Sequence, residues 1–329
     1  MRNLMFRIAV GTVAVGLLAA GCGGKRADNA TAGQTTSCEA GEGRVTIATG
    51  NAGGVYFTVG GGLAQLISTN TKLKANAAET GASVQNIQQL VAGDYDLAFS
   101  LADTAADAVN GKGAFDGKPQ KVQALTRLYS NFTQVLVRTD SGINSIADMK
   151  GKRISTGSPK SGTEVIANRL LQAAGINPES DVQAQRLDLT KTADGMKDGS
   201  IDGLVWSGGL PTAQMTDITT SLKEKVKFID ITTQLDALKK INPVYAKGTI
   251  PAATYAQPAD VPTVVVPNVL LVRADFPDGN ACAITKLIFD KKADLEKVHP
   301  AAKDIVKDKA TDTDPVPLHL GSKQALLDK

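Results

Sequence analysis

Two stretches of this chain decide its fold: ATGNAGGVYFTVGGGLAQL at residues 48–66 and STGSPKSGTEVIANRLLQAAG at residues 155–175. Each begins with a small residue followed by Thr-Gly and continues through a turn rich in Gly and Ser. Each then becomes an apolar pattern with helical spacing. The β-branched patterns RVTIAT and GKRISTG, typical of strands, lead into them. The sequence therefore predicts a strand–turn–helix unit that occurs twice.

The two halves of the chain continue in the same order. In the first half, SVQNIQQLVAG predicts an amphipathic helix that ends at Gly93, and YDLAFS predicts a strand. In the second half, VQAQRLD predicts a strand, TKTADGMKDG a helix and IDGLVWS a strand. Thr49 and Ser100 are 51 residues apart, as are Thr156 and Ser207. Because strands alternate with helices, we expect an α/β protein with largely parallel sheets and two lobes built on one plan.

Two extended patterns are candidates for the connections between the lobes. TQVLVR would leave the first lobe at Arg138, and VPTVVVPNVLLVRADF would return to it. We expect lobe 1 to contain residues 44–138 and 266–329, and lobe 2 to contain residues 139–265. NACAITKLIFDKKADLEKV predicts a helix packed on the outside of lobe 1.

The N-terminus predicts export. Arg2 and Arg7 precede a short apolar run that fits a secretory signal and is too short to span a bilayer. The run ends in LAAGC, which is typical of a bacterial lipoprotein. We expect a signal peptide at residues 1–21 and an acyl anchor at Cys22, which would hold the protein on the outer side of the cell membrane. Cleavage at AAG to release a free protein is the alternative. The small, polar residues 22–43 predict a flexible tether.

The charge balance excludes nucleic acid as a partner. The chain has 36 basic and 33 acidic residues, and the signal peptide removes Arg2 and Arg7 but no acid, which leaves 34 against 33. A near-neutral chain with 4% aromatic residues has no electrostatic footprint for nucleic acid. The 42% hydrophobic content supports a globular body, which we expect to be a monomer.

Cys38 and Cys282 are the two cysteines that remain. In an exported protein a disulfide between them is chemically permitted, although sequence spacing does not show that their Cβ atoms approach. We expect the pair to be bonded, with two free thiols as the alternative.

The body of the chain resembles the TAXI family, the substrate-binding subunits associated with tripartite (TRAP) transporters. The resemblance rests on ATGNAGGVYFTVGGGLA, LYSNFTQVLVR, SIADMKGKRISTGSPKSGTE and DGLVWSGGLPT, which together cover most of the chain from Val45 to Phe289. It implies a type II periplasmic-binding-protein fold with a central ligand cleft and hinge strands. It also implies a TRAP-type membrane permease as partner and a small organic anion, such as glutamate or a related carboxylate, as ligand. SLADTA departs from the family, in which the resemblance implies a Gln beside the ligand.

The candidate ligand residues follow the strand ends. Open α/β sheets bind ligands beyond the carboxyl ends of their strands, at helix N-termini that attract carboxylates. TGNAGGVYF offers backbone N–H groups, TGSPKSGTE adds short hydroxyls, and the only Trp offers an apolar wall. The predicted set is Gly53, Gly54, Val55, Tyr56, Ser100, Thr156, Ser158, Ser161, Gly162, Thr163, Trp206 and Gly208. A glycine turn needed only for packing, plain helix capping by Ser161 and a buried core Trp206 remain alternatives.

Catalytic patterns are missing from the sequence. His299 and His319 have no partners at metal-ligand spacing, TDTDP lacks the rest of a calcium loop, and there is no G-x-S-x-G elbow. We therefore expect a binding protein without cofactor or metal rather than an enzyme. Two alternatives remain: a sensor that contacts a membrane signalling protein, and a hydrolase or lyase on the same two-lobe plan.

Overall fold

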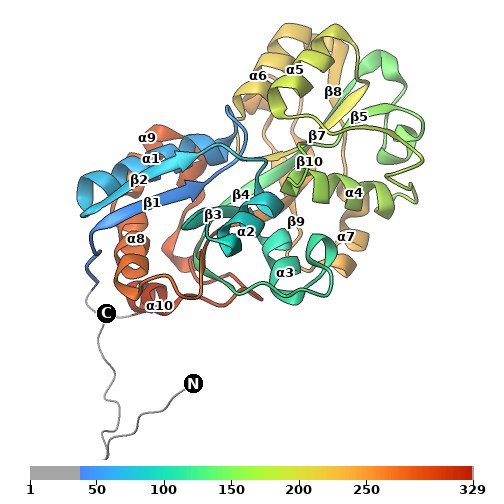
Figure 1. The fold of residues 1–329 in the computed structure, drawn as a ribbon. Coiled ribbons are helices and arrows are strands. Elements are labelled where there is room, and N and C mark those ends of the chain that lie inside the picture. The colour runs from blue at the N-terminus through green and yellow to red at the C-terminus, as the bar shows by residue number, and fades with distance from the viewer. Residues whose placement is uncertain (1–37, 328–329) are drawn as a thin grey trace, which may run out of the picture. The chain divides into compact units, whose positions relative to one another are not determined.

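The computed structural model describes residues 38–327 (Figure 1). The predicted signal peptide, Cys22 and the tether up to residue 37 lie outside this range. Within it, no helix is long and apolar enough to cross a membrane. The strands are β1 (Gly43–Ala48), β2 (Leu73–Ala78), β3 (Leu97–Leu101), β4 (Val122–Arg138), β5 (Arg153–Ser155), β6 (Gln183–Gln185), β7 (Gly203–Gly208), β8 (Val226–Phe228), β9 (Ala246–Ile250) and β10 (Val261–Arg273). The α-helices are α1 (Val55–Asn70), α2 (Ser83–Ala92), α3 (Ala102–Asn110), α4 (Gly162–Ala173), α5 (Leu189–Asp198), α6 (Ala213–Leu222), α7 (Leu235–Ile241), α8 (Asp278–Asp290), α9 (Lys292–Val298) and α10 (Leu320–Leu327).

The strand order shows two halves built on one plan. The main path of the sheet is β2-β1-β3-β10-β4-β7-β5-β6. On one side, β1 pairs in parallel with β2 and β3; on the other, β5 pairs in parallel with β6 and β7. An antiparallel strand follows each group, β10 beside β3 and β4 beside β7. The two-lobe α/β prediction is confirmed, and the central strands are antiparallel where largely parallel sheets were expected.

Strands β4 and β10 cross between the two groups (Figure 1). The N-terminal part of β4 pairs with the C-terminal part of β10, which in turn pairs with β3. Residues 132–138 of β4 pair with β7 and β8, and residues 261–265 of β10 pair with β9. Residues 132–138, which were expected in lobe 1, thus pair with strands of the second sheet group. Below, lobe 1 denotes residues 38–131 and 266–327, and lobe 2 denotes residues 132–265.

The helices begin and end where local chemistry favours it. Helix α2 ends at Gly93, whose φ of 88° lies in the left-handed region that closes a helix with little strain. Helix α4 begins after Ser161, whose hydroxyl accepts a hydrogen bond from the N–H of Glu164. The Ala-rich helix α3 and strand β2 were not predicted, because ADTAADAVN and LKANAA carry no strong apolar period.

The same carboxylate contact occurs in both lobes at the N-terminal edge of the parallel strands. Asp96, just before β3, accepts a hydrogen bond from the N–H of Thr46 in β1 at 2.8 Å. Asp202, just before β7, accepts one from the N–H of Arg153 in β5 at 2.8 Å. The Asp of YDLAFS and the Asp of IDGLVWS thus form equivalent hydrogen bonds between neighbouring strands.

The start of the described chain is attached to lobe 1. Cys38 and Cys282 are joined by a disulfide, with their Cα atoms 5.1 Å apart. The N–H of Gly41 donates to Oδ1 of Asn280 at 2.8 Å. Residues 38–41 are therefore fixed to α8, although the predicted tether extended to residue 43. The long helix expected at 280–298 is divided at Lys291 into α8 and α9.

Candidate functional site

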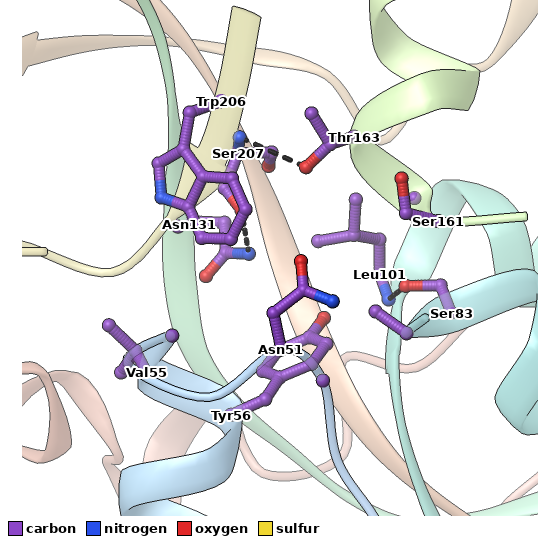
Figure 2. A pocket seen from close by; sticks show the side chains of 15 residues that line it. Asn51, Val55, Tyr56, Ser83, Leu101, Asn131, Ser161, Thr163, Trp206 and Ser207 are labelled. Carbon is purple, nitrogen blue, oxygen red and sulfur yellow. Dashed lines mark hydrogen bonds between the residues drawn. The ribbon is translucent and has the colours of Figure 1, made fainter. Parts of the chain in front are cut away.

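A small cavity lies between the lobes, at the carboxyl ends of the parallel strands (Figure 2). In Figure 2, Asn51, Val55 and Tyr56 of lobe 1 lie on one side, and Trp206 and Thr163 of lobe 2 lie on the other. The volume of the cavity is about 30 Å³, enough for a few water molecules. It is lined by Gly50, Asn51, Gly54, Val55, Tyr56, Ala82, Ser83, Leu101, Asn131, Ser161, Gly162, Thr163, Trp206, Ser207 and Gly208.

Three helices begin at this cavity. They are α1 at Val55, α2 at Ser83 and α4 at Gly162. Helix starts leave N–H groups without intrahelical partners and carry a partial positive charge of about +0.5 each. Between residues 38 and 327, five of the cavity-lining residues at these starts have N–H groups that find no hydrogen-bond acceptor: Val55, Tyr56, Ser83, Gly162 and Thr163. The cavity therefore collects main-chain donors from both lobes.

The hydroxyl groups of the cavity hold its wall together. Ser161 caps α4, and Oγ1 of Thr163 accepts a hydrogen bond from the N–H of Ser207 at 3.2 Å. Oγ of Ser83 accepts one from the N–H of Leu101 at 3.1 Å. Each hydroxyl thus uses a lone pair for the protein. Those of Ser161 and Thr163 keep their protons to donate, whereas that of Ser83 also interacts with the Tyr56 hydroxyl. The capping alternative for Ser161 is correct, and it is compatible with a place in the cavity.

One hydroxyl in the cavity has no partner in the described part of the chain. The side chain of Ser207 is buried, with the residue 6% exposed, and its Oγ makes no hydrogen bond. A buried hydroxyl without a partner costs free energy comparable to a lost hydrogen bond. This atom is the clearest sign that the cavity is shaped for a group that the protein itself does not supply.

The aromatic residues form apolar walls with anchored polar ends. The indole N–H of Trp206 donates to Oγ1 of Thr212 at 3.1 Å, while its ring approaches Gly54 across the cavity. Tyr56 packs against Phe99, with ring centroids 5.1 Å apart, and its hydroxyl donates to Oδ1 of Asn268. Burial raises the pKa of Tyr56 well above its ordinary value, so the phenol stays neutral.

The two strands that cross between the lobes meet beneath the cavity through asparagines. Nδ2 of Asn268 in β10 donates to Oδ1 of Asn131 in β4 at 2.8 Å, and Nδ2 of Asn131 donates to the carbonyl of Ser207 at 3.2 Å. The hydroxyl of Tyr56 in α1 donates to Oδ1 of Asn268 and so joins the same series of hydrogen bonds. Neither asparagine was predicted to belong to the site, because the only signal of each is an amide in the middle of an apolar strand pattern.

Eight of the twelve predicted ligand residues line the cavity: Gly54, Val55, Tyr56, Ser161, Gly162, Thr163, Trp206 and Gly208. The other four lie close by. Oγ of Ser100 donates to the carbonyl of Leu101, and the N–H of Thr156 donates to the carbonyl of Gln185. Ser158 and Gly53 contact the opposite lobe. That these twelve residues contact a ligand stays a prediction.

The lobes touch at the rim of the cavity. Oγ of Ser158 donates to Oδ1 of Asn51 at 2.9 Å, and the N–H of Gln85 donates to the carbonyl of Lys160 at 3.1 Å. Gly53, at φ 76°, lies so close to Gln214 that an added Cβ would sit 1.9 Å from Nε2. These contacts and the small volume of the cavity define a closed arrangement of the lobes.

A buried ionic cluster also joins the lobes. Arg169 of α4 donates to Oδ2 of Asp103 at 2.8 Å and to the Tyr245 hydroxyl at 2.9 Å. Its other Nη donates to Asp107 of α3. Burial acts to lower the pKa of Arg169, but Asp103, Tyr245 and Asp107 outweigh it and raise the pKa above the usual value. Burial raises the pKa of Asp107, and Arg169 opposes that shift.

The cavity carries no formal charge. None of its lining residues is Asp, Glu, Lys, Arg or His. Between residues 38 and 327, no three His, Cys, Asp or Glu side chains gather in a group able to hold a metal ion. Any charge selectivity must therefore come from helix starts and oriented hydroxyls.

Comparison with known proteins agrees with this architecture. Two α/β lobes, a cleft between them and two connecting strands define the type II periplasmic-binding-protein fold, the fold of extracytoplasmic solute-binding proteins. The chain belongs to the NMT1-like family, which it matches over residues 47–327.

Several solved structures share this fold. A protein from Bordetella bronchiseptica is 20% identical, with coverage of 86% of this chain and 80% of that chain and a TM-score of 0.55. A binding protein component of an ABC phosphonate transporter from Pseudomonas aeruginosa is 13% identical, with 80% coverage of both chains and a TM-score of 0.52. An ATP-bound protein from Xanthomonas citri is 13% identical, with 87% and 94% coverage and a TM-score of 0.50.

Proposed function

We propose that this protein is an extracytoplasmic solute-binding protein that captures a small organic anion and delivers it to a membrane transporter. The observation that carries the proposal is the meeting of three helix starts, with unpaired N–H groups, at one uncharged cavity between the lobes. Such an arrangement favours an anion through fixed dipoles.

A binding role fits the cavity better than catalysis. The described lining residues include no acid, base or histidine that could exchange a proton near the hydroxyls of Ser161 or Ser207. A sensor would use the same ligand site and differ in its membrane partner. Loss of ligand uptake in cells that lack this protein would support transport, whereas unchanged uptake with loss of a signalling response would favour the sensor.

The resemblance of the sequence to TAXI proteins supports a TRAP-type permease as the partner and a carboxylate, either glutamate-like or dicarboxylic, as the ligand. The phosphonate-transporter component from Pseudomonas aeruginosa supports the general transport role and adds phosphonates to the ligands worth testing. Affinity capture of the membrane complex identifies the permease class.

We further propose that Cys22 anchors the protein to the cell membrane, since LAAGC follows a basic and apolar leader. Cys22→Ala should move the protein from the membrane fraction to the soluble fraction. Unchanged fractionation of the variant would overturn the anchor without affecting the binding role.

A thermal-shift panel tests the ligand class. Carboxylates, amino acids, phosphonates, sulfonates, sugars and metal ions are compared at equal concentrations. A ligand at a hundred times its Kd stabilises the folded state by about 2.7 kcal/mol. At about 2–4 °C per kcal/mol for a large domain, the Tm should rise by more than about 5 °C. Shifts with sugars or metal ions alone would contradict the anion site.

A further inference from the structure

We propose that the ligand is a singly charged oxyanion that carries no ammonium group, such as a small monocarboxylate or its 2-oxo or 2-hydroxy form. This inference rests on the proposed binding function and narrows its ligand class. It separates such acids from glutamate, which the sequence resemblance implies.

The first argument is the supply of donors. Five unpaired N–H groups face or border the cavity, and the unpartnered hydroxyl of Ser207 adds a buried side-chain group to them. The hydroxyls of Ser161 and Thr163 each accept a hydrogen bond from a main-chain N–H, which leaves their protons available to donate. The wall therefore presents hydrogens to the ligand.

The second argument is that several acceptors of the wall are already engaged and none of them is charged. Oδ1 of Asn51 already accepts from Ser158, and Oδ1 of Asn131 accepts from Asn268. The carbonyl of Gly50 accepts from Thr80. An ammonium group needs three acceptors and a compensating charge when it is buried. The lining residues offer it no carboxylate.

The neighbouring carboxylates are already engaged. Asp103 lies two residues beyond Leu101 of the cavity, but its oxygens are held by Arg169, Tyr245 and the N–H of Thr104. Glu79 accepts a hydrogen bond from the N–H of Ala52 outside the lining set. An amino-acid ligand would therefore bury its ammonium group without a carboxylate partner, or would break a contact that joins the protein together.

The third argument is the amount of positive charge. Three helix starts at about +0.5 each supply roughly one and a half charges, and no Lys or Arg adds to them. One negative charge lies within this field, whereas two would exceed it. A second carboxylate would enter the same closed cavity without a cation to meet it.

Matched ligands of equal size provide the test. Isothermal titration of the full mature chain compares pyruvate, L-lactate and propionate with L-alanine, and glutarate with L-glutamate. We expect at least one monocarboxylate to bind more than 100-fold tighter than L-alanine and tighter than both five-carbon acids. Equal or tighter binding of L-alanine or L-glutamate would overturn this inference and leave the binding function standing. Failure of all carboxylates, methylphosphonate and methanesulfonate to bind would overturn the proposed function itself.

Ser207→Ala tests the donor set on the same ligand. The variant removes a buried hydroxyl that has no partner in the protein, so its unfolding should be unchanged or shifted to slightly higher temperature. Its affinity for the bound monocarboxylate should fall about 10-fold. Ser322→Ala is the matched control, because Ser322 is also a buried serine but lies outside the cavity lining and bonds the hydroxyl of Thr285. Equal affinities of the two variants would overturn the role of Ser207 as a donor.

Discussion

At the scale of single residues, equivalent positions of the two lobes have different roles. Ser100 and Ser207 end corresponding strands, yet only Ser207 lines the cavity. The hydroxyl of Ser100 is used locally, on the carbonyl of Leu101, whereas that of Ser207 remains free. The internal repeat in the sequence predicts the strand ends, and the packing of the lobes decides which of them lines the cavity.

Asn131 gives a prediction at the same scale, because its amide joins Asn268 of the other crossing strand to the Ser207 carbonyl. Asn131→Leu should lower the free energy of unfolding by about 1–3 kcal/mol, since it leaves buried polar groups unpaired. Urea denaturation measures this loss. Asn70→Ala, at an exposed position, is the control and should stay within about 0.5 kcal/mol of the wild type. If the free energy of unfolding falls no further in Asn131→Leu than in Asn70→Ala, the hydrogen bonds of the Asn131 amide add no stability.

At the scale of elements, the start of α4 is shaped for the closed lobes. Gly162 is the first residue of this helix in lobe 2, and an added Cβ would lie 2.5 Å from Cδ1 of Leu101 and 2.7 Å from Oγ of Ser83, both in lobe 1. These distances are too short for an unshifted side chain. A helix that looks ordinary in the sequence is therefore constrained at its first residue by the opposite lobe.

Gly162→Ala should hold the lobes apart without unfolding either of them. Small-angle scattering should give a larger radius of gyration than for the wild type, and added ligand should compact the variant less. Gly61→Ala in α1 is the control, because its new methyl group meets no atom within 4 Å. A scattering profile of Gly162→Ala that matches the wild type would mean that Leu101 and Ser83 adjust at little cost.

The tie between β5 and β7 gives a pH prediction. Hydrogen bonds from the Arg153 side chain lower the pKa of Asp202, with burial opposing. Because the folded pKa lies below the unfolded value of about 3.9, this carboxylate stabilises the fold above that pH and loses the effect as pH falls through its folded pKa. The stability difference between the wild type and Asp202→Asn should therefore be largest from about pH 5 to 7 and shrink below about pH 4. A difference that stays constant down to pH 3 in urea titrations would contradict this assignment.

At the scale of the whole molecule, polar contacts as well as apolar packing join the lobes. The cluster of Arg169 with Asp103 and Asp107 connects α4 of lobe 2 to α3 of lobe 1. A buried ion pair adds little net stability, but removal of one partner leaves an uncompensated buried charge. Arg169→Met should lower the free energy of unfolding by about 3–5 kcal/mol.

A second variant separates the charge effect from lost packing. Arg169→Met combined with Asp107→Asn removes one of the two unpaired carboxylates, so part of the lost stability should return. Thermal unfolding at constant pH compares the three proteins. No recovery in the double variant would assign the loss to packing of the Arg169 side chain.

The disulfide belongs to the same scale, since its two cysteines are 244 positions apart in the chain. Cross-links that close long loops restrict the unfolded chain, and their loss costs about 2–5 kcal/mol. Cys38→Ala/Cys282→Ala should lower the Tm by about 4 °C or more. Reductant should lower the Tm of the wild type in the same way and leave the variant unchanged. If reductant that is present throughout unfolding does not change the Tm of the wild type, the two thiols are free.

Most of the fold was predictable because local patterns repeat. The Gly- and Ser-rich turns after β1 and β5, the helices they begin and the strand ends near Ser100 and Ser207 all follow from short-range periodicity and capping. The free backbone donors of Val55 and Gly162 followed too, because a helix start fixes where its free N–H groups lie. The N–H of Gly54, also expected as a donor, is bonded to the carbonyl of Asn51.

What only the tertiary structure decided involves residues far apart in the sequence. The exact crossing of β4 and β10, the pairing of Asn131 with Asn268 and the bond between Cys38 and Cys282 depend on segments that the chain brings together from more than a hundred residues away. The lack of a charged side chain in the cavity is likewise a property of the assembled wall. Hydrophobic periodicity determines which face of an element is buried, but contacts across two lobes depend on how those faces pack, and no local pattern encodes that geometry.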